Sequence, residues 1–312
     1  MFKGKKIIAV SPVGRKETMG HLFKQILKQR HVVDEHHMWV NTLVEEDLQF
    51  INDYAEKYPD FVHLKYGCEE LDKEQMGRAD NVKRFYNYCT EPDSFYFKID
   101  DDIIYIEPGT FEKLAQHKLD NPDTFLTFPT IINNQWCTHF LRKSAKINIP
   151  TCKILDHDWY VEFEKVRQEI VSSDRTMSED LSEPRAKHFG NLESVALSPL
   201  YWGNPEIAYH LLAGFKEIVT QGTIIQLDIE NVEMKSYENM SINFIMWAGE
   251  DFKKFDGRLR SIGDEMWLNC FYPAHAGLFN TMVGNTRAVH YAYYTQREFL
   301  NGTNILQLYD DI

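Results

Sequence analysis

The sequence predicts an α/β fold, with a mainly parallel central sheet, helices on both faces and an abutting second half. Along the first 130 residues, short apolar runs typical of buried strands alternate with segments whose apolar residues recur at helical spacing. The chain also has 312 residues, 43% of them hydrophobic, so it can bury a large core in one large domain or two modest ones.

The predicted elements alternate in type through the first part of the chain. Pro59 ends the second helix, and Asn204 with Pro205 is a strong start signal for a later one. Strands are predicted at residues 6–11, 38–41, 61–64, 95–99, 125–132 and 288–294, and helices around residues 19–27, 48–58, 79–89 and 205–219. The polar segment at 156–197 reads as a helix followed by a long loop, either a lid or a loop without function.

The net charge of the chain limits the kinds of partner that it is expected to bind. The net charge is −13, and no basic stripe interleaved with aromatic residues is present, so nucleic acid is not an expected partner. If so acidic a chain binds a diphosphate, the repulsion must be cancelled locally, and a divalent cation is the usual means.

Cysteine usage and hydropathy indicate a cytoplasmic protein. The five cysteines are scattered and form no CxxC pair, which argues against a disulfide framework and a structural zinc site. The apolar run at residues 7–10 is too short for a signal peptide, and no run approaches the length of a membrane span.

The strongest chemical signal is a run of three carboxylates, Asp100 to Asp102, directly after the predicted strand at 95–99. If strand geometry continues, Asp100 and Asp102 point the same way. Neighbouring carboxylates that are partly buried at a sheet edge need a cation, and carboxylate oxygens suit Mg²⁺ or Mn²⁺. A solvated acidic turn is the alternative interpretation.

This segment resembles the DxD motif of GT-A fold glycosyltransferases, in which a strand, an Asp-x-Asp and a hydrophobic stretch follow one another. Here the hydrophobic stretch is residues 103–106. The resemblance implies a divalent metal, Mn²⁺ or Mg²⁺, held on the diphosphate of a nucleotide-sugar donor. It also implies that Asp102 is a direct metal ligand and that Asp100 binds the metal or the ribose.

A histidine far downstream extends the resemblance. Residues 288–293 resemble the C-terminal strand of many members, where a histidine completes the metal site, which implies His290 as a further ligand. A packed core histidine is the alternative. The pair His36 and His37 shows no matching partner in the sequence and is interpreted as surface or packing residues.

A third motif lies at residues 263–268 and resembles the acidic motif that opens a helix below the acceptor site of these enzymes. Inverting members use a carboxylate there as general base. The usual order is Glu then Asp, whereas this chain has Asp264 then Glu265. Alignment on Leu268 places Glu265 in the base position, with Asp264 as a helix cap or acceptor ligand. The alternative is an acidic pair at a helix N-terminus.

Donor binding is expected from the first half of the chain. In the family, the loop after the first strand and the helix before the DxD hold the base and ribose. The matching positions here are Ser11, Pro12, Arg15, Arg78 and Asn81. Among the tryptophans, Trp247 is the one singled out as a possible acceptor contact.

Together these motifs predict a single GT-A domain, with residues 1–132 binding the donor and residues 133–312 forming the acceptor-binding and catalytic half. The predicted activity is metal-dependent hexosyl or pentosyl transfer, with inversion, from a nucleotide diphosphate sugar to the hydroxyl of a carbohydrate or other acceptor. Two alternatives stay open. A sugar-nucleotidyltransferase would release pyrophosphate, and a non-catalytic carbohydrate-binding protein would need no diphosphate metal site.

Overall fold

The computed structural model describes residues 1–66, 83–144, 146, 202–235, 237–259 and 263–312. The predicted polar segment at 156–197 lies outside this part of the chain. Among the helices described, none combines the length and the apolar character that a membrane span requires.

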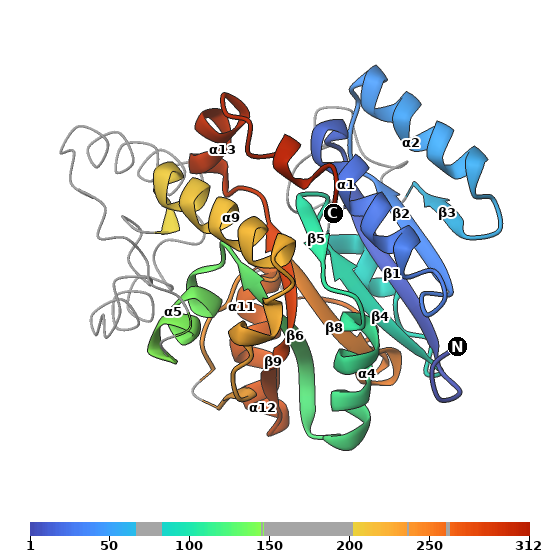
Figure 1. The fold of residues 1–312 in the computed structure, drawn as a ribbon. Coiled ribbons are helices and arrows are strands. Elements are labelled where there is room, and N and C mark those ends of the chain that lie inside the picture. Colours follow the sequence, from blue (N-terminus) through green and yellow to red (C-terminus); the bar gives the residue numbers. More distant parts are fainter. Residues whose placement is uncertain (67–82, 145, 147–201, 236, 260–262) are drawn as a thin grey trace, which may run out of the picture. The chain divides into compact units, whose positions relative to one another are not determined.

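The N-terminal strands form the parallel side of a mixed sheet (Figure 1). They lie in the order β3-β2-β1-β4, with parallel pairing throughout. Every residue of β4 is buried, and so are the last seven of β1, as expected for strands covered on both faces. The four strands are β1 (Lys6–Val13), β2 (Glu35–Val40), β3 (Val62–Lys65) and β4 (Ser94–Ile99).

The remaining strands continue the sheet in the order β8-β6-β9-β5, and β7 pairs with β9. The pairs β4·β8, β6·β8, β5·β9 and β7·β9 are antiparallel, so the predicted parallel arrangement holds for β1 to β4 and not for these pairs. The α/β fold class is confirmed. These strands are β5 (Ile103–Ile106), β6 (Thr124–Ile132), β7 (Val232–Met234), β8 (Phe244–Ala248) and β9 (Phe279–His290).

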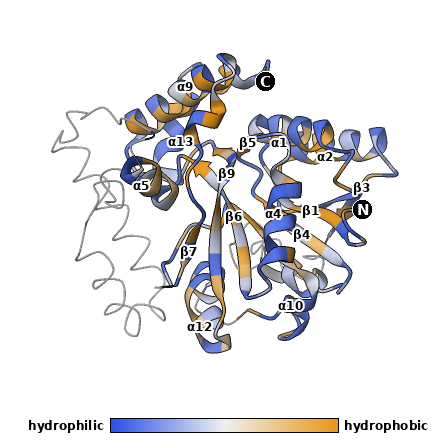
Figure 2. Cartoon of the chain, turned by 60° about the horizontal axis from the view of Figure 1, so that its bottom comes forward, coloured by the Kyte–Doolittle hydropathy of each residue, from blue (hydrophilic) through white to orange (hydrophobic). Residues whose placement is uncertain are grey.

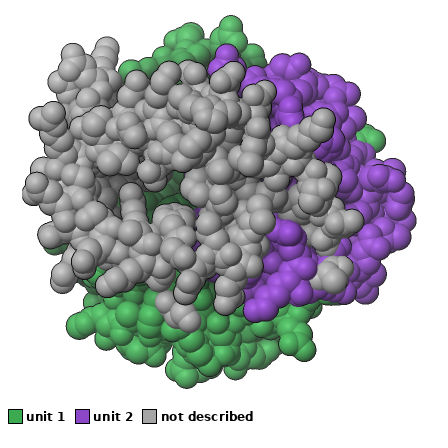
Figure 3. Space-filling model, turned by 90° about the vertical axis from the view of Figure 1, so that its left-hand side faces the viewer, with its two compact units in different colours: residues 1–131, 228–291, 309–312 green, residues 132–227, 292–308 purple. Residues whose placement is uncertain are grey.

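The described chain divides into two compact units (Figure 3). The first comprises residues 1–131, 228–291 and 309–312, and the second comprises 132–227 and 292–308. The chain leaves the first unit at the predicted boundary near residue 132 but returns to it at 228, because β7, β8 and β9 pair within the same sheet. The assignment of residues 1–132 to the donor and 133–312 to the acceptor stays a prediction.

The helices of the first unit are amphipathic, and Figure 2 shows hydrophilic and hydrophobic residues alternating along α1 and α2. The predicted apolar stripe of α1 is buried at Met19, Leu22, Phe23 and Ile26. Residues 83–88 form a short 3₁₀ helix where the third helix was predicted. The α-helices are α1 (Lys16–Lys28), α2 (Glu45–Lys57), α4 (Thr110–Asp120), α10 (Gly249–Lys253), α11 (Asp264–Met266) and α12 (Tyr272–Ala276), with a π-helical turn at Trp267–Phe271 between the last two.

The second unit contains the helix predicted from its start signal. The Asn204 side chain accepts hydrogen bonds from two backbone N–H groups, and Pro205 is the first residue of α9 (Pro205–Thr220). Asn134 caps α5 (Gln135–Lys143) in the same way. The remaining helices among the described residues of this unit are α13 (Tyr294–Asn301) and the 3₁₀ turns Ile224–Leu227 and Gln307–Tyr309, the last of which ends where the chain re-enters the first unit.

Trp247 belongs to the core and not to a sugar-binding surface. Its side chain is fully buried and stacks on Phe252 with ring centroids 4.4 Å apart, and its indole N–H donates to the Cys89 carbonyl at 3.1 Å. The interpretation of Trp247 as an acceptor contact is therefore wrong. The physical reason is that β8 is covered on both faces, so all of its residues are buried.

Candidate functional site

The three consecutive aspartates form a turn between β4 and β5. The chain leaves β4 at Ile99, and the Ile103 N–H donates to the Asp100 carbonyl at 3.0 Å. The backbone N–H of Asp100 donates to the Asn243 carbonyl at 2.9 Å, which anchors the start of the turn. Asp101 and Asp102 are each only 4% exposed, so this is a buried acidic turn and not a solvated one.

Arg15 neutralises two of these carboxylates. The Gly14 N–H donates to Asp101 Oδ2 at 2.9 Å, and Arg15 Nε donates to Asp101 Oδ1 at 2.8 Å. Arg15 Nη1 also lies 3.1 Å from Asp102 Oδ2. Burial disfavours the charged guanidinium, but the carboxylates of Asp102 and Asp101 outweigh it and raise the pKa of Arg15.

Burial also shifts the pKa of the aspartates in the turn. It raises the pKa of Asp101 to about 6, although the Arg15 guanidinium opposes the shift. The pKa of Asp100 is raised as well, first by burial and then by the charge of Asp102, against the attraction of Lys98. The turn therefore holds carboxylates that are costly to ionise without nearby cations.

Lys98 is the cation that serves Asp100. Its ammonium lies 2.5 Å from Asp100 Oδ1 and donates to the Ile242 carbonyl at 2.7 Å, and the residue is only 4% exposed. Successive strand residues alternate between faces, so Lys98 and Asp100 share a side of β4. The sequence analysis assigned Lys98 no role, although a lysine within a buried strand directly before three aspartates is itself an unusual signal.

His290 lies beside Asp102, while its predicted role as a metal ligand stays a prediction. It is the last residue of β9, and the antiparallel ladder places it opposite Ile103. His290 Nε2 lies 3.6 Å from Asp102 Oδ2, and the Tyr291 N–H donates to the Asp102 carbonyl at 2.8 Å. Both side chains are buried, so two possible metal ligands lie side by side in the interior of the first unit.

Asp264 and Glu265 open α11 directly after Gly263, whose φ of +96° is easily adopted only by glycine. The Ser241 hydroxyl donates to Glu265 Oε1 at 3.1 Å, and Asp264 Oδ1 accepts from the Glu265 N–H at 3.1 Å. Burial and the charge of Asp264 raise the pKa of Glu265 to about 7, against the Ser241 bond and the charge of Lys98. Ser241, which bonds Glu265, is two residues from Asn243, whose carbonyl accepts from the Asp100 N–H, so the acidic turn and this helix start lie near one another.

The other predicted donor residues are placed differently. The Ser11 hydroxyl is fully buried and lies 3.1 Å from His36 Nε2, and Pro12 is a buried residue of β1 opposite Trp39. Arg78 and Asn81 lie outside the described residues. The structure thus brings Arg15 to the aspartates and sets Ser11 toward β2, while the roles of all these residues in donor binding stay predictions.

The donor set of the acidic turn suits a divalent cation that takes further ligands from a substrate. Mg²⁺ in such sites is held by one or two carboxylates together with phosphate oxygens, and imidazole is a suitable additional ligand for Mn²⁺. Asp102 and His290 supply one carboxylate and one imidazole 3.6 Å apart. The ligand atoms of Asp100, Asp102 and His290 do not all lie within 4.8 Å of one another. Among the described residues, Glu35, His37 and His63 are the one group of three that meets this distance.

Replacing Lys98 by methionine should destabilise the protein by about 1–3 kcal/mol, because it leaves the Asp100 carboxylate, whose side chain is 23% exposed, without its cation. The loss should be smaller at pH 5 than at pH 8, since protonation of Asp100, whose pKa is already raised, relieves it. Urea unfolding at both pH values measures this. Lys254→Met is the matched control, because the Lys254 ammonium is 58% exposed and its ion pair with Asp251 should contribute at most about 1 kcal/mol. Equal stability of the two variants would contradict a charge-balancing role for Lys98.

Comparison with models of known protein families gives no match, and neither does comparison with curated protein sequences. Two solved structures show a partial likeness. Mannosyl-3-phosphoglycerate synthase from Rubrobacter xylanophilus is 16% identical, with a TM-score of 0.31 over 41% of this chain and 40% of that one. Glucosyl-3-phosphoglycerate synthase from Mycobacterium tuberculosis, solved with Mn²⁺, uridine diphosphate and phosphoglyceric acid, is 17% identical, with a TM-score of 0.31 over 41% of this chain and 44% of that one. The matched part is less than half of either structure's length, and a likeness this partial identifies no activity.

Proposed function

We propose that the protein is a metal-dependent glycosyltransferase that moves a sugar from a nucleotide diphosphate donor to an acceptor hydroxyl. The observation that supports this most is the convergence, in the first unit, of three motifs that are far apart in the sequence. The aspartate turn and His290 meet beside Arg15, and residues 241–243 bond to Glu265, to Lys98 and to Asp100. This combination offers a cation site and a basic carboxylate side by side, which are the two groups that glycosyl transfer from a diphosphate needs.

The cation would be held by Asp102 and His290, with Asp100 as the third candidate ligand or as a contact to the ribose. When bound, Mn²⁺ or Mg²⁺ neutralises charge that builds on a departing diphosphate. The chain's own residues prepare this site. Arg15 fixes the carboxylates of Asp101 and Asp102, and Lys98 holds Asp100. Because Arg15 and Lys98 already pair with oxygens of Asp102 and Asp100, a bound cation would share or replace those contacts.

Glu265 is the proposed general base. In an inverting transfer, it accepts the proton of the acceptor hydroxyl while that oxygen forms its bond to the anomeric carbon and the diphosphate departs. A base works best when its pKa lies near the working pH, and burial brings the pKa of Glu265 to about 7. The Ser241 hydroxyl, which donates to Oε1, orients the carboxylate.

The pH dependence of activity follows from this assignment. Only the ionised Glu265 can accept a proton, so kcat/KM should fall by about tenfold per pH unit as pH drops below about 7, where this carboxyl becomes protonated. Initial rates between about pH 5 and 9 measure the profile. In the Glu265→Gln variant, the activity that remains should no longer fall as pH drops below about 7. A wild-type profile that is flat across neutral pH would contradict Glu265 as the base.

The proposed activity is tested with a panel of nucleotide diphosphate sugars and Mn²⁺, with both the nucleotide and pyrophosphate measured as products. Release of the nucleoside diphosphate from one donor, dependent on Mn²⁺ and stopped by a chelator, would support the transferase. Pyrophosphate release would instead identify a sugar-nucleotidyltransferase. If no donor reacts and none binds with metal, the carbohydrate-binding alternative takes precedence.

A further inference from the structure

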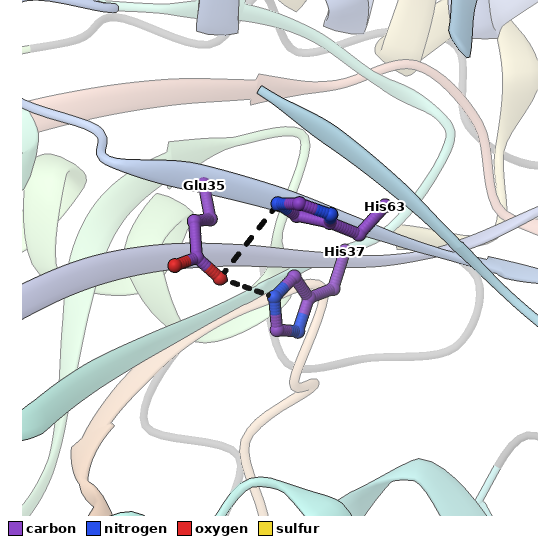
Figure 4. A group of neighbouring side chains, drawn as sticks. All are labelled: Glu35, His37 and His63. Carbon is purple, nitrogen blue, oxygen red and sulfur yellow. Dashed lines mark hydrogen bonds and ion pairs between the residues drawn. The ribbon is translucent and has the colours of Figure 1, made fainter. Parts of the chain in front are cut away.

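A second group of metal-ligating side chains lies on β2 and β3, at the end of the sheet order. Glu35 and His37 are two residues apart on β2 and therefore share one face. The parallel ladder places His63 of β3 directly beside His37. Figure 4 shows both imidazoles directed toward the Glu35 carboxylate. The three side chains thus converge from two strands that are far apart in sequence.

The ligand atoms are close enough to share one ion. Glu35 Oε2 lies 2.8 Å from His37 Nε2 and 3.9 Å from His63 Nε2, and one ligand atom from each residue lies within 4.8 Å of the others. Bonds of about 2.0–2.1 Å in a tetrahedral site place ligand atoms about 3.3 Å apart, so binding needs changes of at most about 1.5 Å between any two atoms. Side chains that are 17–40% exposed can make such adjustments, and an ion can reach them from solvent.

Lys6 prepares the carboxylate for this role. Its ammonium lies 2.6 Å from Glu35 Oε1, the oxygen that does not face the histidines. One carboxylate oxygen is therefore held by a lysine while the other, Oε2, is directed at both imidazoles. Hydrogen-bonded partners of this kind orient ligating carboxylates in metal sites.

The geometry points to a binding site for one divalent transition metal ion of the Zn²⁺ type, held by Glu35 Oε2, His37 Nε2 and His63 Nε2, with a fourth position open to water. Two imidazoles select borderline ions such as Zn²⁺, Co²⁺ or Ni²⁺ over Mg²⁺, which prefers oxygen ligands. The site does not depend on the proposed transferase activity. It joins β2 to β3, the strand at the end of the sheet order, so a bound ion would also fasten that edge strand.

The alternative is a simple hydrogen bond between His37 and Glu35 with His63 as a neighbour. That arrangement accounts for the 2.8 Å contact but gives no reason for the third side chain to direct its Nε2 at the same oxygen. The two interpretations differ in one measurable property, because only a metal site loses affinity for the ion when His63 is removed.

The test is a Co²⁺ titration of chelator-treated, dialysed full-length protein, monitored by the visible absorption typical of four-coordinate Co²⁺. All proteins carry Asp102→Asn, so that the aspartate turn binds as little Co²⁺ as possible. The protein with this substitution alone is the background protein. The background protein should bind one Co²⁺ with this signal. Since loss of a mere outer-shell partner costs 10–100-fold in affinity, His63→Asn or His37→Asn should cost at least about 100-fold. His31→Asn is the control, because the His31 side chain is 70% exposed and contacts Glu112 instead.

A second readout excludes misfolding as the cause. Zn²⁺ should raise the Tm of the background protein and of His31→Asn but not of His63→Asn, whose own Tm without metal should be nearly unchanged because the His63 side chain is 40% exposed. Absence of four-coordinate Co²⁺ absorption in the background protein would overturn the site. Equal Co²⁺ affinity in the His63→Asn, His37→Asn and His31→Asn proteins would overturn it as well.

Discussion

Asp102→Asn should lower kcat/KM by at least about 10³-fold, because a metal at this position is expected to contribute several kcal/mol of transition-state stabilisation. The substitution keeps the shape of the side chain and removes its negative charge. Arg15 keeps its contacts to Asp101, so the turn retains a paired cation and the fold should persist. Steady-state rates at saturating Mn²⁺, with the preferred donor, measure the loss.

A matched control separates this effect from a general loss of acidic charge. Asp60→Asn removes an exposed carboxylate between α2 and β3 and should leave kcat/KM within about twofold, since surface substitutions of this kind are usually neutral. Far-UV circular dichroism and urea unfolding of both variants verify the fold. An Asp102→Asn enzyme with full activity that still requires Mn²⁺ would show that the metal is held elsewhere.

Glu265→Gln should lower kcat by about 10²–10⁴-fold while leaving donor KM and metal affinity nearly unchanged, because it removes the proton acceptor without altering the cation site. The same variant should be more stable than the wild type at pH 8. The folded-state pKa of about 7 lies above the ordinary value of 4.5, so wild-type stability falls as pH rises through this interval. The gain at pH 8 should be about 3 kcal/mol, and at pH 4 it should vanish.

Asp264→Asn decides which member of the acidic pair is the base. Asp264 Oδ1 accepts from the backbone N–H of Glu265, as a residue that supports the helix start would do. Its replacement should therefore cost much less in kcat than Glu265→Gln. A larger loss in Asp264→Asn would reverse the assignment. If both variants keep near wild-type kcat, neither carboxylate of this pair acts as base.

Much of the fold was predictable because its signals are local. The apolar stripe of α1 and the Asn204–Pro205 start of α9 depend on residues a few positions apart. The direction of the later strands was not predictable in this way. Whether β8 runs parallel or antiparallel to β4 depends on the pairing of strands about 150 residues apart. The apolar sequence of a buried strand does not indicate which direction it takes in the sheet. Trp247 was misjudged for the same reason, since its burial depends on which sheet neighbours cover it.

At the candidate site too, local motifs were visible in the sequence and long-range contacts were not. The aspartate run, His290 and the acidic pair were found as motifs, and the structure places His290 beside Asp102. The two basic groups that balance the acids were not recognised in these roles. Arg15 was predicted as a donor-binding residue, a role that stays a prediction, but its contacts to Asp101 and Asp102 were not foreseen, and Lys98 was assigned no role. Ion pairs between residues that are far apart in the chain depend on the fold. They leave no recognisable spacing pattern in the sequence.

The histidine pair at residues 36 and 37 illustrates what strand pairing adds. Both were interpreted as surface or packing residues because no partner was visible in the sequence. The structure separates them by face. His36 is fully buried against Ser11, whereas His37 faces Glu35 and its β3 neighbour His63. That partner lies 26 residues further along the chain and is revealed only by the ladder between β2 and β3.

The most direct test of the central claim is a thermal-shift measurement with UDP, GDP, CDP and dTDP, each with and without Mn²⁺, on the wild type and Asp102→Asn. Mn²⁺ alone is the baseline for each protein, so that any ion bound on β2 and β3 is accounted for. We expect one nucleotide to raise the wild-type Tm by several degrees only when Mn²⁺ is present, and we expect Asp102→Asn to lose this rise. If no nucleotide gives a metal-dependent shift, or if the variant retains the full shift, the aspartate turn is not the site of a metal-bound diphosphate.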